Sequence, residues 1–469
     1  MPELVFLWTD ILVFLLVALV VIFIAYARKR PHLSRPWKQV FSSRIGISTF
    51  IVLLFYITVG LMDSIHYRPD VDDSRNKGAD MLSVLDYVLS DLRLNHEKTY
   101  SAPLATHLYA RENVEGPDGV TTREFPRLKY GGAHLQDPEK DYYPDLLEKT
   151  LLGIVLGLIA WLLLTLLITA WLAISHHVAF TDQVHRIKQH QTEIPWRTAF
   201  ITLLVILVIA GILYQLSQFY HVLGTDKVGE DVLYQALKSV RTGLLIGTLT
   251  TLVMLPAAIL LGIMAGYFKG WIDDVIQYTY TTLNSIPGVL LIAAAILMMQ
   301  IYMSNHEADF TSVTERADLR LLFLCLILGV TSWTGLCRLL RAETFKLSEL
   351  DYVQASRSFG VGNFVIIFKH ILPNVVHIVL ITVVLDFSGL VLAEAVLSYV
   401  NIGVDPSTNS WGNMINSARL EMAREPIVWW SLAASLVFMF TLVLAANLFY
   451  DVVRDAFDPR LRSQSGVKI

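Results

Sequence analysis

Residues 1–30 read MPELVFLWTDILVFLLVALVVIFIAYARKR, an apolar run that ends in three basic residues. A helix needs roughly 20 apolar residues to cross the hydrocarbon core of a membrane, and this run supplies them. A secretory signal peptide carries its positive charges before the apolar run. Here Arg28, Lys29 and Arg30 follow the run. We therefore expect a retained membrane helix whose C-terminal end is cytoplasmic.

Apolar blocks of similar length recur along the whole chain. Of its 469 residues, 54% are hydrophobic and 17% are charged, whereas soluble domains carry about 25% charged residues. We therefore predict an all-α polytopic membrane protein, embedded in a lipid bilayer, with about nine transmembrane helices. The net charge of −4 gives no indication of nucleic-acid binding. The predicted spans are residues 6–27, 45–62, 151–174, 198–217, 241–265, 286–303, 320–337, 375–397 and 427–450.

Lys and Arg are divided unequally between the two sides that these spans define. The short loops and the tail on one side hold nineteen, and those on the other side hold five. Because cytoplasmic loops are enriched in Lys and Arg, we expect the N-terminus outside and the C-terminus in the cytoplasm. Residues 63–149 then form a large extracytoplasmic segment. Within it, apolar spacing over residues 81–92 predicts an amphipathic helix with Asp80 as N-cap, followed by irregular structure or short strands.

Several polar segments could carry chemistry, and each also has a structural interpretation. LGTDKVGEDVL (223–233) reads as a tight turn that leads into a helix. Asp273 and Asp274 are adjacent, so their side chains diverge on a helix, which favours a capping role over acid–base chemistry. The sequence has no GxxxxGK[ST] phosphate loop, and we expect no cofactor and no metal site. The histidines clustered in one cytoplasmic loop, which we interpret as solvated, are His176, His177, His185 and His190.

Two carboxylates fall inside one predicted span. Asp386 and Glu394 are eight residues apart, so they lie on roughly the same face of a helix. Ionisable side chains within a membrane helix are costly when they face lipid. We expect this pair to face the protein interior or a water-filled path.

Residues 352–374, YVQASRSFGVGNFVIIFKHILPN, lie between two predicted spans and are too polar and too short to cross a membrane. Gly360 permits a left-handed bend after a first short helix. An apolar run follows, and Pro373 tolerates the first turn of the next helix but cannot continue a helix from upstream. We expect two short helices at an angle on the cytoplasmic face. They form either an interfacial amphipathic connector or a segment that docks into a partner's groove.

This stretch resembles the cytoplasmic EAA loop of permease subunits in binding-protein-dependent ABC importers. Four further motifs, in the family's order, resemble the second permease of the dipeptide, oligopeptide and nickel systems. They are LGTDKVGEDVL (223–233), GYFKGWIDD (266–274), SWTGLCRLLRAE (332–343) and LSYVNIGVDPSTNSWGNMINSAR (397–419).

The resemblance implies a type I ABC importer core of six helices, preceded here by three extra helices and the extracytoplasmic segment. It also implies a second permease subunit as heterodimer partner, two ATP-binding subunits and an extracytoplasmic solute-binding protein. The implied organisation is two N-terminal helices (1–62), the extracytoplasmic segment (63–149), a third helix and cytoplasmic loop (150–197), the permease domain (198–460) with its coupling loop (345–374), and a cytoplasmic tail (461–469).

In this family the EAA loop couples the permease to the ATPase subunits. Gln354 stands where the family usually has Glu, and Ser356 where it has Ala. Glu230 stands where Arg is usual in the outer motif. The residues that the resemblance places in the coupling role are Gln354, Ala355, Ser356, Gly360, Phe364, Ile367, Phe368 and Pro373.

The sequence therefore predicts a permease subunit of the bacterial inner membrane that serves ATP-driven import of peptides or similar small solutes. It is expected to be a transport subunit and not an enzyme. The alternative is a proton-coupled secondary transporter with Asp386 and Glu394 as its relay. A metal-dependent enzyme that uses the loop histidines, and a structural or assembly subunit built on residues 1–197, are further alternatives.

Overall fold

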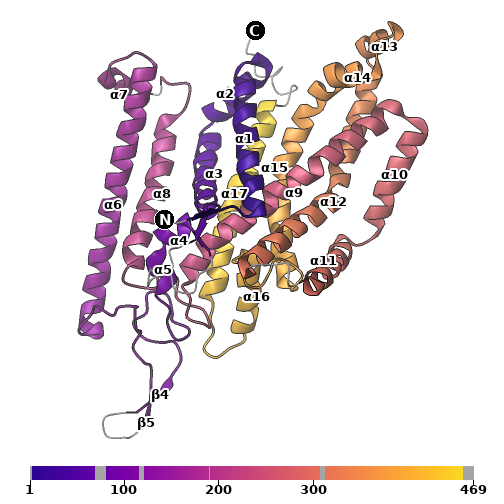
Figure 1. Cartoon of the computed structure of the whole chain (residues 1–469). Helices are drawn as coiled ribbons and strands as arrows, with labels where there is room; N and C mark the ends of the chain where they lie inside the picture. Colours follow the sequence, from indigo (N-terminus) through magenta and orange to yellow (C-terminus); the bar gives the residue numbers. More distant parts are fainter. Residues whose placement is uncertain (1–2, 69–80, 116–120, 190, 307–311, 458–469) are drawn as a thin grey trace. The chain divides into compact units, whose positions relative to one another are not determined.

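The computed structural model (Figure 1) describes residues 3–68, 81–115, 121–189, 191–306 and 312–457. The strands are β1 (Glu3–Val5), β2 (His66–Arg68), β3 (Leu82–Ser83), β4 (Glu112–Glu115) and β5 (Thr121–Glu124). The helices are α1 (Trp8–Arg28), α2 (Pro31–Ser42), α3 (Arg44–Asp63), α4 (Val84–Val88), α5 (Ser90–Leu94), α6 (Pro138–Ser175), α7 (Phe180–Lys188), α8 (Trp196–Ser217), α9 (Val232–Phe268), α10 (Gly270–Ser285), α11 (Gly288–Asn305), α12 (Val313–Ser348), α13 (Asp351–Ser358), α14 (Asn363–Ile366), the π-helical turn η3 (Ile367–Ile371), α15 (Leu372–Tyr399), α16 (Trp411–Glu421) and α17 (Trp430–Phe457).

Nine helices within the described ranges are long and apolar enough to cross a membrane. They are α1, α3, α6, α8, α9, α11, α12, the continuous helix of α14, η3 and α15, and α17. Each overlaps one predicted span, which confirms the all-α polytopic fold. Several helices extend beyond the apolar block, because capping decides where a helix begins. For example, α12 begins at Val313, where the Ser312 hydroxyl accepts the N–H of Glu315 at 3.1 Å.

The chain forms two compact units, which we describe separately. Unit 1 comprises Met1–Val5, Arg30–Thr242 and Asn409–Val452. Unit 2 comprises Phe6–Lys29, Gly243–Thr408 and Val453–Ile469.

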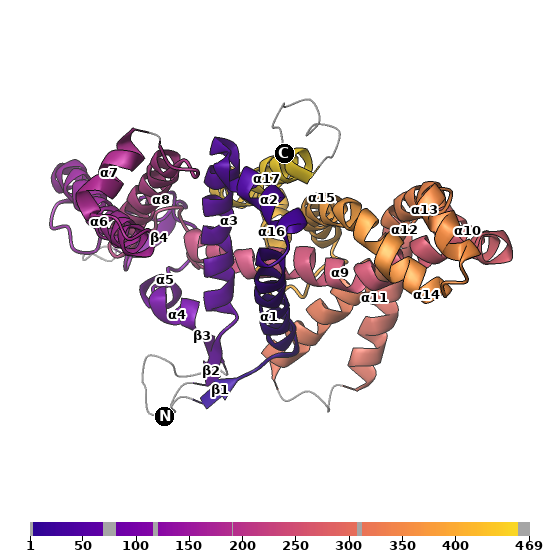
Figure 2. The ribbon, with the colours of Figure 1, turned by 90° about the horizontal axis from the view of Figure 1, so that it is seen from above.

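Helices α6 and α8 of unit 1 are packed backbone to backbone through glycines, and they run side by side in both views (Figures 1 and 2). A Cβ atom on Gly157 would lie 2.6 Å from the Leu207 carbonyl oxygen, and one on Gly211 would lie 2.5 Å from the Gly153 oxygen. Small residues spaced in this way let membrane helices approach closely. The indole N–H of Trp161 also donates to the carbonyl of Phe200 at 2.8 Å.

Helix α3 joins this pair to the rest of unit 1. Its Ser48 hydroxyl accepts a hydrogen bond from Thr202 of α8 at 3.1 Å. On another side, the Tyr56 hydroxyl donates to the carbonyl of Phe438 in α17 at 2.9 Å. The extra helix α3 is therefore bonded to α17, which lies within the region that resembles the permease.

The packing of α6 on α8 predicts that Gly157→Leu destabilises the protein. The new side chain would collide with α8 backbone, and overpacking of this kind costs about 1–3 kcal/mol. The midpoint of thermal unfolding of the purified chain in detergent should therefore fall. Gly335 of α12 has open space around it, so Gly335→Leu is the matched control and should leave the midpoint within experimental error. An equal effect of both substitutions would contradict the glycine packing.

The outer part of unit 1 differs from the single amphipathic helix expected over residues 81–92. Asp80, the expected N-cap, lies outside the described residues. The helix instead starts after Ser83, whose hydroxyl accepts the N–H of Asp86 while the Asp86 carboxylate accepts the N–H of Ser83. It breaks at Leu89 into two short helices, α4 and α5. The prediction of one helix is wrong, because this capping box begins the helix late and the first residues instead form strand β3.

Two small sheets accompany these helices, and only the second lies in the later part of residues 63–149, where short strands were predicted. Strand β2 pairs antiparallel with both β1 and β3. Strands β4 and β5 form an antiparallel hairpin in which Glu112 is opposite Glu124. The hairpin confirms the prediction of short strands.

Helix α1 belongs to unit 2, although it lies outside the region that resembles the permease. Its Thr9 hydroxyl and Thr9 N–H both donate to the Asp318 carboxylate of α12, the N–H at 3.1 Å. Leu12 and Val13 pack against a buried cluster that includes Leu321, Leu324 and Leu397. The first extra helix is thus bound to α12.

Helices α9 and α12 form the closest contact in the part of unit 2 that leads to the EAA-like loop. A Cβ on Gly262 would lie 2.8 Å from the Cys337 carbonyl oxygen, and one on Gly266 would lie 2.6 Å from that of Arg341. The glycines are four residues apart, so both lie on one face of α9. A fully buried cluster that includes Met254, Leu340 and Val375 surrounds this contact.

Candidate functional site

The EAA-like loop leaves the membrane on the end of α12. Residues Glu349 and Leu350 make the corner between α12 and α13. Helix α13 ends at Ser358, and Gly360 follows with a φ of +75°. The predicted left-handed bend is therefore present. Figure 2 shows α13 and α14 beside the ends of α12 and α10.

The second short helix of the loop is not separate from the next span. Helix α14 continues through η3 into α15 as one helix over Asn363–Tyr399. The sequence predicted that Pro373 would stop any helix from upstream, and this prediction is wrong. A π-helical turn bonds each N–H five residues back and widens the helix. It lies at Ile367–Ile371, immediately before the proline ring.

The side chains of the loop divide into an exposed set and a buried set. Phe359, Phe364 and Phe368 are 87%, 77% and 61% exposed. Val353 and Ile366 are buried in the core of unit 2, and Ile367 packs partly against the same core. Gln354, Ala355, Gly360 and Pro373 are exposed, and Ser356 is half-buried.

The sequence missed Phe359 as a candidate contact residue. It precedes the bend glycine, and its position at the helix end gave no apolar periodicity from which its exposure could be predicted. Full burial of a Phe side chain by a partner contributes about 1.5–3 kcal/mol. Three exposed rings on one short loop therefore form a surface that a protein partner can cover with useful affinity.

Ion pairs hold the base of the loop. The Arg341 guanidinium of α12 donates to both carboxylate oxygens of Asp273 in α10, at 2.5 and 2.7 Å. This pairing with Arg341 lowers the pKa of the Asp273 carboxyl. Asp273 lies in the first turn of α10, where the sequence predicted a carboxylate at the start of a helix, and its side chain also binds α10 to α12. Tyr267 at the end of α9 donates to the Asn363 side chain at 3.0 Å.

The two carboxylates of the α15 span have different surroundings. Glu394 is buried, and the Ser398 hydroxyl donates to it at 2.7 Å. Asp386 is half-buried and, within the described residues, makes no hydrogen bond or ion pair. Glu394 is thus held by its own helix, and Asp386 is the carboxylate of the pair that remains open to a ligand or a partner.

In unit 1, two clusters of charged side chains bind residues 63–149, the outer segment of the sequence prediction, to the chain that leads into α9. The first is centred on Lys238 of α9, whose ammonium contacts Asp63 at 2.8 Å and Asp86 at 2.9 Å. The Tyr234 hydroxyl donates to Asp86 at 2.7 Å. These groups link α3, α4 and α9.

The second cluster is centred on the buried His221. Its Nδ1 lies 2.8 Å from the Asp231 carboxylate, and its Nε2 lies 3.5 Å from that of Glu97. Burial disfavours the charged imidazole, but the two carboxylates outweigh this and raise the pKa of His221 to about 9. Burial also opposes ionisation of Glu97, yet His221 and the N–H groups of residues 129–131 lower the Glu97 pKa to about 2.

Residues 223–233 form the tight turn that the sequence predicted. Gly224 and Gly229 have φ values of +73° and +80°, and the Asp231 carboxylate accepts the N–H groups of Leu233 and Tyr234 at the start of α9. A Cβ on Gly229 would lie 1.9 Å from the carbonyl oxygen of Glu97. The turn is therefore shaped to receive the backbone of the outer segment.

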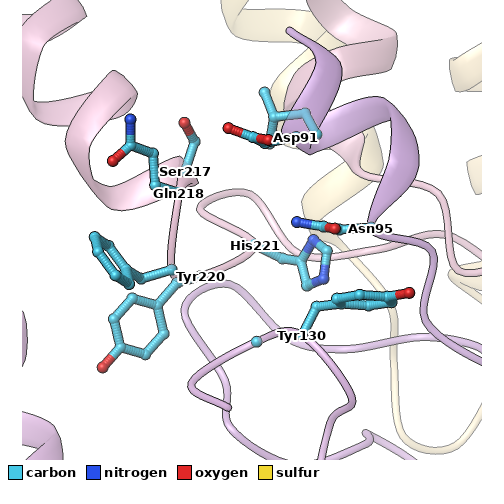
Figure 3. A pocket seen from close by; sticks show the side chains of 10 residues that line it. Asp91, Asn95, Tyr130, Ser217, Gln218, Tyr220 and His221 are labelled. Atoms are coloured by element: carbon cyan, nitrogen blue, oxygen red, sulfur yellow. The ribbon is translucent and has the colours of Figure 1, made fainter. Parts of the chain in front are cut away.

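Figure 3 shows a pocket beside this cluster, with Asn95, Tyr130 and His221 along one side. The pocket has a cavity volume of about 10 Å³, which is little more than room for a water molecule. Sites for drug-sized ligands usually occupy about 300–1,000 Å³. We therefore assign no ligand to this pocket. We interpret the His221 cluster as a structural interaction that holds Glu97 against the turn at residues 223–233.

The His221 cluster predicts how stability depends on pH. The pKa of His221 is about 9 in the folded chain and about 6.5 in an unfolded chain. Its stabilising contribution is therefore complete below about pH 6.5 and is lost as the pH rises through about 9. The loss corresponds to about 3 kcal/mol at most. For Glu97 the sign is opposite, since its contribution is present above about pH 4.5 and is lost as the pH falls towards 2.

We expect the thermal unfolding midpoint of the purified chain to fall between pH 6.5 and 9.5, and His221→Gln to remove most of this dependence. His107, an exposed histidine of the outer segment, supplies the control His107→Gln, which should keep the wild-type pH profile. If the unfolding midpoint of His221→Gln depended on pH as the wild type does, the proposed structural role of the cluster would be contradicted.

Comparisons with known proteins agree with the fold. A family model described as the binding-protein-dependent transport system inner membrane component matches residues 258–463. The chain is 32% identical over 243 residues to the glutathione transport system permease protein of Pectobacterium atrosepticum, which covers 52% of this chain and 74% of that protein. It is 31% identical over 245 residues to the oligopeptide transport system permease protein of Mycobacterium tuberculosis, which covers 52% and 77%. It is 29% identical over 240 residues to the dipeptide transport system permease protein of Lactococcus lactis, which covers 51% and 64%.

The chain belongs to the family of permease subunits of binding-protein-dependent ABC importers. It is a transport subunit and a multi-pass protein of the inner membrane. This membership favours ATP-driven import over the proton-coupled alternative.

Proposed function

We propose that this permease subunit imports peptides and that residues 345–374 couple it to the ATPase subunits. The relatives are named for glutathione, oligopeptides and dipeptides, and peptides are the class that these names share. The observation that carries the coupling role is the set of exposed rings, Phe359, Phe364 and Phe368, on a loop held by the α9–α12 contact.

The partners that we propose are a second permease subunit, two ATP-binding subunits that hydrolyse ATP, and an extracytoplasmic solute-binding protein. ATP binding would close the ATPase dimer and draw the two coupling loops together. Because α12 carries the loop and is packed on α9, this movement would bias the permease between inward-open and outward-open states. We propose residues 198–460 as the boundaries of the permease domain and 461–469 as a cytoplasmic tail.

The transport pathway would be lined in part by Asp386. A half-buried carboxylate in mid-span is costly against lipid, so a water-filled path or a partner subunit is the environment that suits it. A free peptide carries a cationic amino terminus, which an ionised carboxylate binds. Glu394 is a weaker candidate for the pathway, because it is buried and bound by Ser398.

The coupling role predicts a specific defect for Gly360→Ala. Any Cβ at its φ of +75° is strained by roughly 1–2 kcal/mol, and a tilt of α13 relative to α14 would relieve the strain. Because binding energy is concentrated in a few well-placed contacts, ATPase subunits should co-purify several-fold less and peptide uptake should fall with them. Membrane insertion should be unchanged.

Gly362 provides the matched control for this experiment. It lies two residues further on, has equally open surroundings and has an ordinary φ of −61°. Gly362→Ala should therefore keep ATPase association and uptake near the wild-type levels. Full association and uptake in Gly360→Ala would show that the loop is not the coupling site.

We further propose that the N-terminus lies outside and the C-terminus in the cytoplasm, on the strength of the nineteen-to-five division of Lys and Arg. Reporter fusions at Asn76 and after Arg462 should be active in opposite compartments; both positions lie outside the described residues. Activity of the two fusions in the same compartment would exclude a nine-span topology.

A further inference from the structure

We propose that Gln354 is a positioning residue that holds α13 against the corner residue Glu349, and that it does not contact the ATPase. The proposal rests on the coupling role of the loop. It assigns a function to the residue at which this chain departs from the usual glutamate of its family.

The corner between α12 and α13 consists of only Glu349 and Leu350. The Gln354 side-chain amide donates to the backbone carbonyl oxygen of Glu349 and to its carboxylate Oε2, each at 3.2 Å. Carbonyl groups at the end of a helix have no partner within that helix. One amide group therefore closes the end of α12 and fixes the first turns of α13 to it.

The other oxygen of the Glu349 carboxylate is bound from a different helix end. Lys269 lies between α9 and α10, and its ammonium contacts Glu349 Oε1. The same ammonium lies 4.3 Å from the centre of the Phe345 ring on α12. The Glu349 carboxylate is thus held by Lys269 through one oxygen and by Gln354 through the other.

Lys269 is itself held in an unusual backbone conformation. Its φ is +55°, and Gly270 follows with a φ of +58°, so the chain reverses direction between α9 and α10. The contacts from Lys269 to Glu349 and from Glu349 to Gln354 therefore connect the end of the α9–α12 contact to α13. They provide a direct path by which movement of α9 turns the coupling loop.

This geometry explains why glutamine, and not glutamate, stands at position 354. An ionised carboxylate only accepts hydrogen bonds. A glutamate at position 354 would lose both donations to Glu349. It would also place a second negative charge beside the Glu349 carboxylate, and like charges at this distance repel.

The test is a double-mutant cycle on the complex of permease and ATPase subunits. Gln354→Glu should reduce ATPase co-purification and uptake by roughly three- to tenfold, the equivalent of one net hydrogen bond. Glu349→Gln combined with Gln354→Glu should restore part of both, because the new amide at position 349 can donate to the new carboxylate while the bond to the Glu349 backbone carbonyl stays lost. A side chain that met the ATPase directly would not be restored by a change at position 349.

A pH profile gives a second readout that general damage to the loop would not produce. When two carboxylates are in contact, the pKa of one of them is raised, so the pair keeps one proton up to a higher pH than an isolated carboxylate does. Uptake by Gln354→Glu, normalised to the wild type at each pH, should therefore recover as the pH is lowered from 7.5 to 5.5. The double variant has a single carboxylate at this site, and its normalised uptake should not change with pH.

Two results would overturn the proposal. One is wild-type association and uptake in Gln354→Glu while Gly360→Ala is defective, since the loop would then couple without needing Gln354. The other is a defect in Gln354→Glu that the double variant fails to restore, which would place Gln354 at the ATPase surface. If both Gly360→Ala and Gln354→Glu leave association unchanged, the coupling role itself fails, and the inference fails with it.

Discussion

The contact between the backbones of α9 and α12 is the constraint on which the part of unit 2 that carries the EAA-like loop depends. There is no room for a side chain at Gly262 or Gly266, because backbone carbonyl oxygens of α12 lie against these two glycines of α9. In a membrane, where lipid tails are as apolar as the helices, such dispersion contacts replace the hydrophobic effect as the force for association. This contact, together with the Asp273–Arg341 ion pair and the Tyr267–Asn363 hydrogen bond, holds the base of the EAA-like loop.

The outer end of unit 1 is held by a different force. Lys238 and His221 are each placed between two carboxylates. Residues 63–149 supply both carboxylates to Lys238 and one, Glu97, to His221. Removing one partner of a buried ion pair costs about 3–5 kcal/mol, because a charge is then buried without compensation. The outer segment is therefore part of the folded permease and not an independent attachment to it.

The parts of the structure that the sequence predicted are those that depend on composition and on backbone sterics. Apolar length locates each of the nine spans, and the isolated Gly360 locates the bend, because few other residues tolerate its φ. The errors occur where side-chain bonding overrides these signals. Ser83 and Asp86 begin a helix late within residues 81–92, and a π-helical turn lets Pro373 continue a helix that it was expected to stop.

Two features of the loop that the sequence did not predict, the exposure of Phe359 and the bonds from Gln354 to Glu349, depend on how α13 folds at the end of α12. Phe359 is exposed because the bend turns it away from the core, and Gln354 bonds to Glu349 because α13 folds back on the corner. Neither relation leaves a periodic pattern along the chain. The departure from the usual glutamate was visible in the sequence, but its meaning required the neighbouring carboxylate to be located.

The fastening of Glu97 by His221 also has a consequence for biosynthesis. About 120 residues separate these two side chains in the sequence, and two long apolar helices, α6 and α8, lie between them. At roughly 5–20 residues per second, the ribosome needs on the order of 6–25 s to make the partner after Glu97 has emerged. During that interval the segment has its carboxylates without their cations, and only the arrival of α9 in the bilayer supplies Lys238. These contacts of residues 63–149 can therefore form only after α6, α8 and the start of α9 have been synthesised.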